Sequence, residues 1–241
     1  MGVFFSKDVR FYFGGYDPGT AMTRFRQPLE VGALDNTTFT QAAERVLPDI
    51  RQDKLEWAGL FDDGADSLDA AVGVLVGTST NNHISILYGT ATGNRAYSGT
   101  ALQIGLHQPA EIRGLIRSEA VFIIEGQWKP GAHYGAKQTL TGTSGTAVTG
   151  TIDNTAASTG SGTLFVHVLT ITGGTSSLVF EDSADNVTYA GLVTLVATGK
   201  RSFATSVGSA GSGTIRRYTR VRHATGTGTS AEFAAVLVRG S

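Results

Sequence analysis

Short stretches in which hydrophobic and polar positions alternate recur along the first half of the chain. This period of two residues is typical of β-strands that bury one face. In the segment 53–61 it places Leu55 and Trp57 on one face and Lys54 and Glu56 on the other. We expect a strand followed by a polar corner at 29–39, and further strands at 9–13, 23–26, 53–61, 84–88, 101–106, 112–116 and 120–128.

One segment of the first half has the period of a helix. Its apolar residues recur at the i, i+3, i+4, i+7 spacing of a helix that packs on a sheet: Leu68, Ala71, Val72, Leu75 and Val76. An Asp or Ser can cap its start and Gly77 can close its end. The pattern predicts one helix over residues 66–76.

The second half alternates in the same way and is richer in Thr, Val and Ser. The segment 163–172 alternates along its whole length and ends at Gly173. We expect strands at 163–172, 177–182, 187–189, 192–196, 216–222 and 232–239. Short strands at this regular spacing indicate a β-sandwich.

Between the halves, residues 135–163 consist mainly of Gly, Thr, Ser and Ala, without an aromatic residue. Such a composition cannot bury a core of its own. It predicts a domain boundary, with one β domain at 1–137, a linker at 138–145 and a β-sandwich at 146–241. The segment 147–153 has enough Val, Thr and Ile to be the first strand of the sandwich.

Charge and cysteine content exclude several classes of protein. The chain has 19 basic and 20 acidic residues, which gives no support for electrostatic binding of nucleic acid. The absence of cysteine excludes disulfides, zinc–thiolate sites and cysteine nucleophiles. The N-terminus lacks a signal-peptide pattern and no apolar run approaches the roughly 20 residues of a membrane span, so we expect synthesis in the cytoplasm and no membrane segment.

Two acidic groups could be sites. Asp182, Asp185 and Asn186 could hold Ca²⁺, but the segment lacks the central Gly and closing Glu of a calcium loop, so we interpret it as a hairpin turn. A second group could suggest the paired carboxylates of a glycosidase, yet it falls in a turn and a first helical turn, where acids are common. Its members are Asp62, Asp63, Asp66 and Asp69.

The histidines show no spacing that a metal or catalytic site requires. They are His83, His107, His133, His167 and His223. We therefore predict no catalytic residue, no cofactor site and no metal site, and we expect that the protein is not an enzyme.

Two further features suggest surfaces. The segment 216–222 places Arg216, Tyr218, Arg220 and Arg222 on one face, which could be a nucleic-acid surface, although a solvated sheet face or an interface with an acidic subunit is the favoured interpretation. The connector 89–99 is polar and rich in Gly, with Arg95 and Tyr97 near its end. It predicts a projecting loop that contacts a neighbour.

The order of motifs resembles a known family. The stretch VRFYFGGYDPGTAMTRF, then LDNTTF, LPDIRQDKLEWAGLFDDG and DSLDAAVGVL, resembles the tail tube (major tail) proteins of long-tailed bacteriophages over residues 9–134. The second half, with GTLFVHVLTITGG, LVFEDSADNVTYAGL and RRYTRVRHATGTG, is similar to β-sandwich domains appended to phage virion proteins. The resemblance implies a mainly β fold: a tail-tube-like β-barrel or sandwich with one flanking helix, plus a C-terminal β-sandwich.

The same resemblance implies a function. Members of the family form hexameric rings that stack into the tail tube, through which DNA passes without specific binding. The expected partners are copies of the chain and other tail proteins: the tape measure, terminator and distal tail proteins. An appended outer domain would obstruct a contractile sheath, which implies a non-contractile tail and a location in the virion. The alternative is a head decoration or carbohydrate-binding adhesin module, with Tyr189 and Tyr218 as exposed aromatics.

Overall fold

The computed structural model describes residues 8–18, 22–26, 29–35, 46–60, 82–107, 117–141, 149–208, 213–224 and 230–240. Within these ranges the chain forms β-strands and no α-helix, which confirms the mainly β prediction. The predicted helix 66–76 and the predicted strand 112–116 lie outside the described residues. No described helix is long and apolar enough to cross a membrane.

The first half contributes seven strands, and the longest of them are β4, β6 and β7. Their bounds are β1 (Val9–Phe13), β2 (Met22–Arg26), β3 (Leu29–Asp35), β4 (Val46–Leu60), β5 (His83–Tyr88), β6 (Arg95–His107) and β7 (Arg117–His133). Strands β4, β6 and β7 are much longer than expected, because their ends alternate less regularly than their buried centres.

The second half contributes the remaining strands. Their bounds are β8 (Gln138–Thr141), β9 (Ile152–Asp153), β10 (Gly162–Thr172), β11 (Ser176–Ser183), β12 (Ala190–Ala197), β13 (Arg201–Val207), β14 (Tyr218–Ala224) and β15 (Ser230–Arg239). The predicted strand 187–189 is instead part of the turn before β12, and β13 was not predicted. Of the predicted strand 147–153, only β9 is a strand among the described residues.

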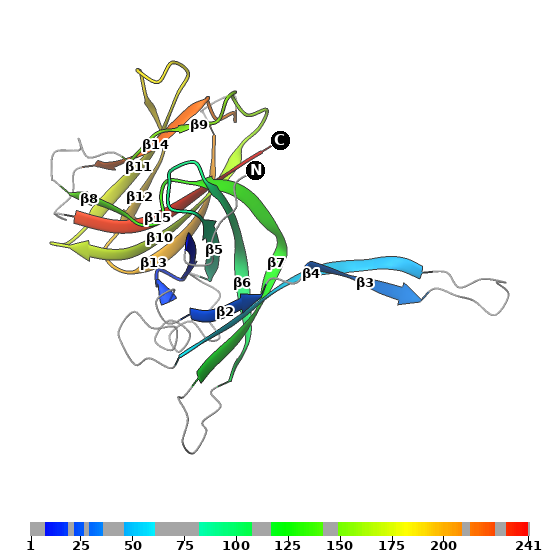
Figure 1. The fold of residues 1–241 in the computed structure, drawn as a ribbon. Coiled ribbons are helices and arrows are strands. Elements are labelled where there is room, and N and C mark those ends of the chain that lie inside the picture. The colour runs from blue at the N-terminus through cyan, green and yellow to red at the C-terminus, as the bar shows by residue number, and fades with distance from the viewer. Residues whose placement is uncertain are drawn as a thin grey trace.

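Two sheets contain all of these strands. An 11-stranded sheet has the order β1-β5-β6-β7-β15-β10-β13, with β2, β3, β4 and β8 attached beside it. A 4-stranded sheet has the order β12-β11-β14-β9. The large sheet curls, so that its two halves face each other in part, and the small sheet packs on β10 and β15 to form the sandwich (Figure 1).

The large sheet runs through the predicted domain boundary without interruption. Strand β15 pairs with β10 and β8, and its Val236 and Leu237 pair with His133 and Ala132 at the end of β7. The predicted linker 138–145 begins with a strand, β8, which is held along β15. The division into two domains stays a prediction, and the connection between the halves is a hydrogen-bonded sheet.

Three buried clusters form the core. One fills the sandwich between the two sheets and includes Phe180, Val221 and Phe233. A second covers one face of the first half and includes Phe11, Trp57 and Phe122, which confirms the prediction for Trp57. The third lies where the halves face each other. It contains Tyr12, Leu87, Ala96, Phe165, Leu169, Ala234 and Val236.

Candidate assembly surfaces

Strand β3 and the first part of β4 form a two-stranded antiparallel ribbon, here called the arm. Its register runs from Leu29 opposite Asp53 to Asp35 opposite Val46. From Lys54 onward, β4 lies in the body, between β2 and β7. Among the described residues no third strand pairs with the arm, and Figure 1 shows it extending away from both sheets. The arm therefore presents two strand edges for pairing.

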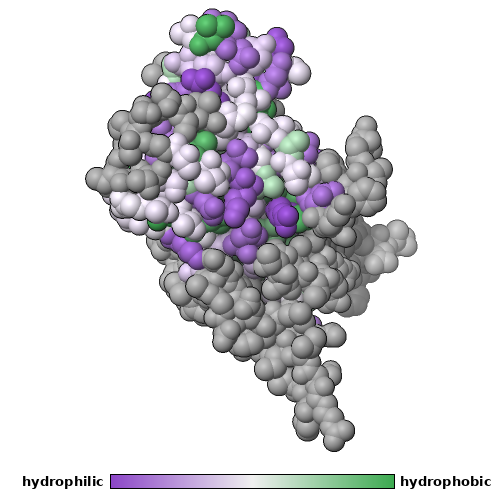
Figure 2. Space-filling view, turned by 60° about the vertical axis from the view of Figure 1, so that its left-hand side comes forward, coloured by the Kyte–Doolittle hydropathy of each residue, from purple (hydrophilic) through white to green (hydrophobic). Residues whose placement is uncertain are grey.

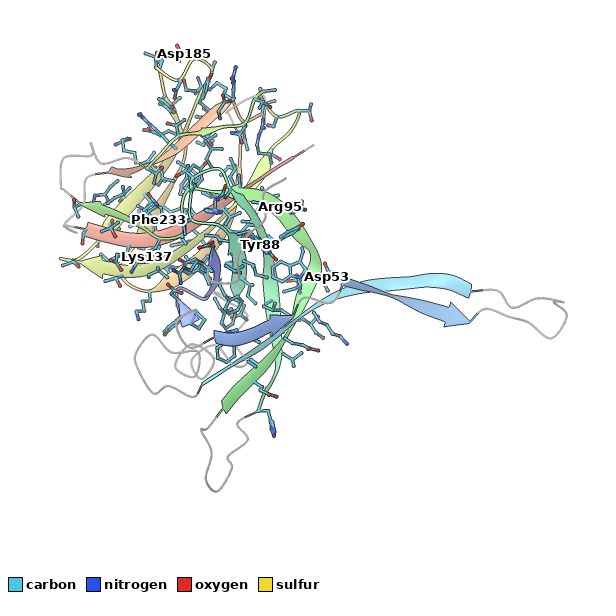
Figure 3. The ribbon with its side chains drawn as sticks, viewed as in Figure 1. Asp53, Tyr88, Arg95, Lys137, Asp185 and Phe233 are labelled. Atoms are coloured by element: carbon cyan, nitrogen blue, oxygen red, sulfur yellow. The ribbon has the colours of Figure 1, made fainter. Side chains whose placement is uncertain are left out.

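A buried carboxylate marks the point where the arm leaves the body. Asp53 is fully buried, and its Oδ2 atom accepts a hydrogen bond of 2.9 Å from the backbone N–H of Trp128 in β7 (Figure 3). Asp53 pairs with Leu29 at the base of the arm, and the next residue, Lys54, pairs with Ile123 of β7 in the body. The Asp53 bond thus ties the base of the arm to the middle of β7.

One face of the body sheet is left open by the second half. Residue pairing places Lys54, Ile123 and Leu102 in one row, and Glu56, Val121 and Gly105 in the next. We call this the open face; the pairing also places Thr100, His107, Glu119 and Glu125 on it, and sets Arg26 opposite Glu56, Arg24 opposite Ala58 and Arg117 opposite Leu60. Leu102 is 52% exposed, whereas the opposite face carries the buried cluster around Trp57.

A buried polar contact joins the two halves of the molecule, in a region here called the seam. The Nε2 atom of His167 in β10 lies 2.9 Å from the Oγ of Ser85 in β5, which lies 2.7 Å from the Oγ of Ser98. The ring of Tyr12 stacks on the His167 ring, with 5.9 Å between centroids. All four side chains are buried, so the seam is a dry contact between sheet halves.

Burial determines the protonation of the seam. It lowers the pKa of His167 to about 3, and nearby His83 acts in the same direction. Burial also lowers the pKa of His83 and raises the pKa of Tyr12 well above its usual range. These groups are therefore neutral at pH 7, and the seam carries no charge that would need solvent.

The arginines of β14 and the turn before it bond to acids of the same chain. Arg216 holds Asp182, which is fully buried, through Nε at 2.8 Å, and Arg220 and Arg222 both bond to Glu181 at 2.9 and 2.6 Å. Their side chains lie on one face as predicted, while Thr219 and Val221 face the core. Acids of the same chain thus bind the arginines that could have bound an acidic neighbouring subunit. This face of β14 is therefore a sheet face with ion pairs inside the chain.

The two candidate glycan-binding tyrosines are covered by arginines. The guanidinium carbon of Arg220 lies 3.6 Å from the centroid of the Tyr189 ring, and that of Arg217 lies 4.8 Å from the centroid of Tyr218. Both tyrosines are half-buried. One ring face of each is thus occupied by a cation, and the adhesin alternative stays a prediction.

The acidic turn after β11 has the role predicted for it. Asp185 Oδ1 accepts hydrogen bonds of 2.9 Å from the N–H groups of Val187 and Thr188, and Asn186 has the left-handed φ of 62°. These bonds lower the pKa of Asp185 to about 2. Asp182 points instead into the ion pair with Arg216. Figure 3 places Asp185 at the outer tip of the sandwich.

Two of the histidines, His83 and His167, lie near each other at the seam. His133, His167 and His223 are buried, and His107 is exposed. His223 bonds to Ser176, and His133 accepts from the N–H of Gly135. No group of three or more His, Cys, Asp or Glu that could hold a metal occurs among the described residues. The second acidic group, Asp62 to Asp69, lies outside them.

The prediction that residues 89–99 form a projecting loop is wrong, because part of this segment is a strand. Strand β6 begins at Arg95, so the connector is a tight turn with positive φ at Gly89 and Gly93. Arg95 stacks on Tyr97, whose ring meets the ring of Tyr88 edge to face. Two glycines that accept positive φ allow a short hairpin where a polar, Gly-rich sequence suggested a long loop.

Sequence reasoning missed the residues that place these surfaces. Asp53 was treated only as the start of a strand, and Tyr12, Ser85 and Ser98 were not singled out. Alternation gives no signal for Ser85, because it falls between Ile84 and Ile86 and thus at the position that the pattern assigns to the polar face. Ser85 is buried because the second half packs on that face, where its partner His167 lies 82 positions away in the chain.

No family model and no curated protein sequence matches this chain. Solved structures with a similar fold belong to tail, tube or hub assemblies. The tail of an empty gene transfer agent particle has a chain with 14% identity, covering 45% of this chain and 80% of its own (TM-score 0.34). The sheath–tube complex of an extracellular contractile injection system has one with 9% identity, covering 54% and 92% (TM-score 0.41).

The SPP1 Dit protein, described as a hub adsorption apparatus of phages that infect Gram-positive bacteria, is similar over both halves. It is 9% identical and the match covers 97% of this chain and 99% of its own, with a TM-score of 0.35. Similarities at this level are too weak to assign a role to this chain.

Proposed function

We propose that this protein is a structural subunit of a bacteriophage tail, which assembles with copies of itself into rings that stack as a tube for DNA. The observation that carries the proposal is the arm. A two-stranded ribbon is marginally stable by itself in water, and its backbone edges need partners. A neighbouring copy supplies such a partner at the same position on every subunit.

Repetition of that contact explains a ring. The arm of one copy and the body of the next are different surfaces, so the contact is heterologous, and a heterologous contact that closes gives a cyclic assembly. The sequence resemblance over residues 9–134 covers both the arm and the body sheet. It supports six-fold rings, a non-contractile tail, and tape measure, terminator and distal tail proteins as further partners.

The second half fits the outside of such an assembly. It is joined to β7 and β8 through β15 and not through the arm, so it leaves the arm free (Figure 1). On the face shown in Figure 2, its described part carries hydrophilic and intermediate positions with few hydrophobic ones. A ring of subunits would hold the sandwiches in fixed orientations.

The test compares the full chain with a variant that lacks the arm. Leu29 and Asp53 are directly opposite each other, so an Asn-Gly turn between them removes the arm and keeps the hairpin of β2 and β4. Light scattering and negative-stain imaging should show rings or tubes for the full chain and folded monomers for the variant. A full chain that stays monomeric at high concentration, or an armless variant that assembles equally well, would disprove the proposal.

A further inference from the structure

Each half of the molecule has a buried core of its own, and the contact between the halves is a third, smaller cluster among the described residues. The sandwich core lies between the two sheets, the core around Trp57 lies in the first half, and the seam lies where the halves face each other (Figure 1). Two adjacent residues of β15 show the separation, because Ala234 belongs to the seam and Ala235 to the sandwich core. The seam can therefore open while both cores stay intact.

A narrow piece of sheet joins the halves beside the seam. Strand β15 pairs with β7 through Val236 and Leu237, whereas it pairs with β10 from Ser230 to Arg239. The short strand β8 continues this connection along the other end of β15. A junction of this kind holds two bodies together and permits a change of angle between them once their other contact is lost.

His167 is the polar centre of the seam, and one of its ring nitrogens has no partner there. Its Nε2 atom lies 2.9 Å from the Oγ of Ser85, but its Nδ1 atom is buried and has no hydrogen-bond partner in the described part of the chain. A neutral imidazole carries one N–H group and a protonated imidazole carries two. Protonation therefore puts a charge and an N–H group without an acceptor into a dry contact, and both are unfavourable there.

The side chains that face His167 are neutral or basic. They are His83 and Ser85 of β5, Ser98 of β6 and Tyr12 of β1, and the residues opposite His167 in its own sheet are Ser202 and Ala234. The charged groups at the border of the seam are Arg10 and Asp17, which act on Tyr12, and Lys200 and Arg201, which stack on Tyr16 and Phe203. The charge that acts on His167 itself comes from His83, which disfavours protonation.

We propose that the seam is an acid-operated contact: protonation of His167 separates the two halves, while each half keeps its own core and the β7–β15 junction holds the halves together. In the open form the imidazole and Ser85 bond to water. The low pKa of His167 in the closed seam, about 3 against 6.5 for a free imidazole, agrees with this. Because the open form binds the proton more tightly, each pH unit below about 6.5 raises the ratio of open to closed form up to about tenfold.

The absence of cysteine from the chain makes a direct test possible, since one introduced thiol reports on one position. Ala234→Cys and Ala96→Cys place the thiol in the seam, and Ala235→Cys and Ala101→Cys place it in the two cores. All four alanines are fully buried, and each seam position has a matched core position on the same strand, β15 or β6. The reaction of each thiol with dithiodipyridine is timed at a series of pH values and divided by the rate for free cysteine.

Between about pH 7 and about pH 4.5 we expect the normalised rate at both seam positions to rise about 100-fold, and the rate at both core positions to rise less than about threefold. In the Ala96→Cys background, His167→Gln should reduce the rise at least about tenfold, because glutamine does not titrate. His107→Gln, at an exposed position, is the control for the substitution. Circular dichroism checks that each variant is folded, and the two seam positions lie on different strands, so one misfolded variant leaves the test in place.

Equal rises at the seam and core positions would show that acid unfolds the whole chain, and a constant rate at the seam would show that it stays closed. Either result would overturn the proposal, as would an unchanged rise in the His167→Gln variant. The seam lies within one chain, so the test does not depend on ring formation. A protein that stays monomeric and opens in acid would refute the tube proposal and keep this one.

Discussion

His167 and Ser85 lie 82 positions apart in the chain, yet their side chains form a buried hydrogen bond of 2.9 Å. The bond links β10 to β5, and so joins the two halves at a place where the sheet curls back on itself. Because the imidazole is fully buried and neutral, its protonation requires a charge in a dry contact.

The seam should make the protein sensitive to acid. The pKa of His167 falls from 6.5 in the unfolded chain to about 3 in the folded protein, so the unfolded state binds a proton first as the pH decreases. The contribution of neutral His167 to the free energy of unfolding is fully present above about pH 6.5 and is lost progressively as the pH decreases toward 3. The total loss is on the order of 5 kcal/mol, and urea unfolding at a series of pH values measures it.

The His167→Gln variant separates the contribution of His167 to the pH dependence of stability from the contributions of the other histidines. Glutamine can keep a hydrogen bond to Ser85 and does not titrate, so we expect a shallower fall in stability below pH 6. His83 and His133, whose pKa values are also lowered by burial, should retain part of the dependence. His107→Gln, at an exposed position, is the control for the substitution itself. An unchanged profile for His167→Gln would contradict the assignment.

A glycine at the end of β1 should be irreplaceable. Gly15 has a φ of 91°, and a Cβ atom there would lie 2.5 Å from the N of Arg201 and 2.8 Å from the O of Val168. Gly93 has nearly the same φ, 88°, with no atom within 4 Å of its Cβ position. Gly93→Ala should cost about 1 to 2 kcal/mol of unfolding free energy from backbone strain alone, and Gly15→Ala at least twice that. Equal losses would show that the contact has no role.

The ion pair of Asp182 should contribute strongly to stability, since the carboxylate is fully buried and binds both the backbone N and the guanidinium of Arg216. Asp182→Ala removes the acceptor of the Arg216 backbone N–H and the partner of its guanidinium, whose side chain is 34% exposed, and we expect a loss of about 1 to 3 kcal/mol in chemical denaturation. Asp153→Ala breaks the exposed pair with Arg217 and should leave the denaturation midpoint close to that of the unaltered protein. Similar midpoints for the two variants would refute this ranking.

Replacement of Asp53 should affect the base of the arm. Asp53→Ala removes the acceptor of the Trp128 N–H, and an unsatisfied buried donor costs about 1 to 3 kcal/mol. Asp53→Asn keeps an oxygen acceptor and should cost less. Hydrogen exchange should show faster exchange at the Trp128 amide in Asp53→Ala than in Asp53→Asn. Slow exchange in both variants would show that another contact protects this amide.

The sequence predicted the strands better than their connections. Alternation located β1 and β10 almost to the residue, and it placed Trp57 on a buried face, because these strands bury one or both faces. Strand β13 was not predicted, since Ser stands at a buried position (Ser202) and also at an exposed one (Ser206), so the strand shows no clear alternation. The arm was also missed as a unit, because a ribbon outside the core leaves no hydrophobic pattern.

Long-range pairing was beyond the reach of a single sequence. A run of Gly, Thr and Ser predicted a linker at 138–145, but β8 lies within it and pairs with Ser230 to Phe233 of β15, which come 89 to 95 positions later in the chain. The arginines of β14 were assigned to one face correctly, yet their acids on β11 could be paired with them only after the antiparallel register was known. The contacts that define the assembly surfaces are of this long-range kind.

Strand β15 is the last strand in chain order, yet it pairs with β7, β8 and β10. During synthesis, those strands must wait with an open edge until residues 230–239 leave the ribosome, since no described strand takes the place of β15 between β7 and β10. Pairing over such long sequence separations slows folding and exposes edges to aggregation. The large sheet can therefore close only after residues 230–239 have been synthesised, and the edges of β7 and β10 stay unpaired by β15 until then.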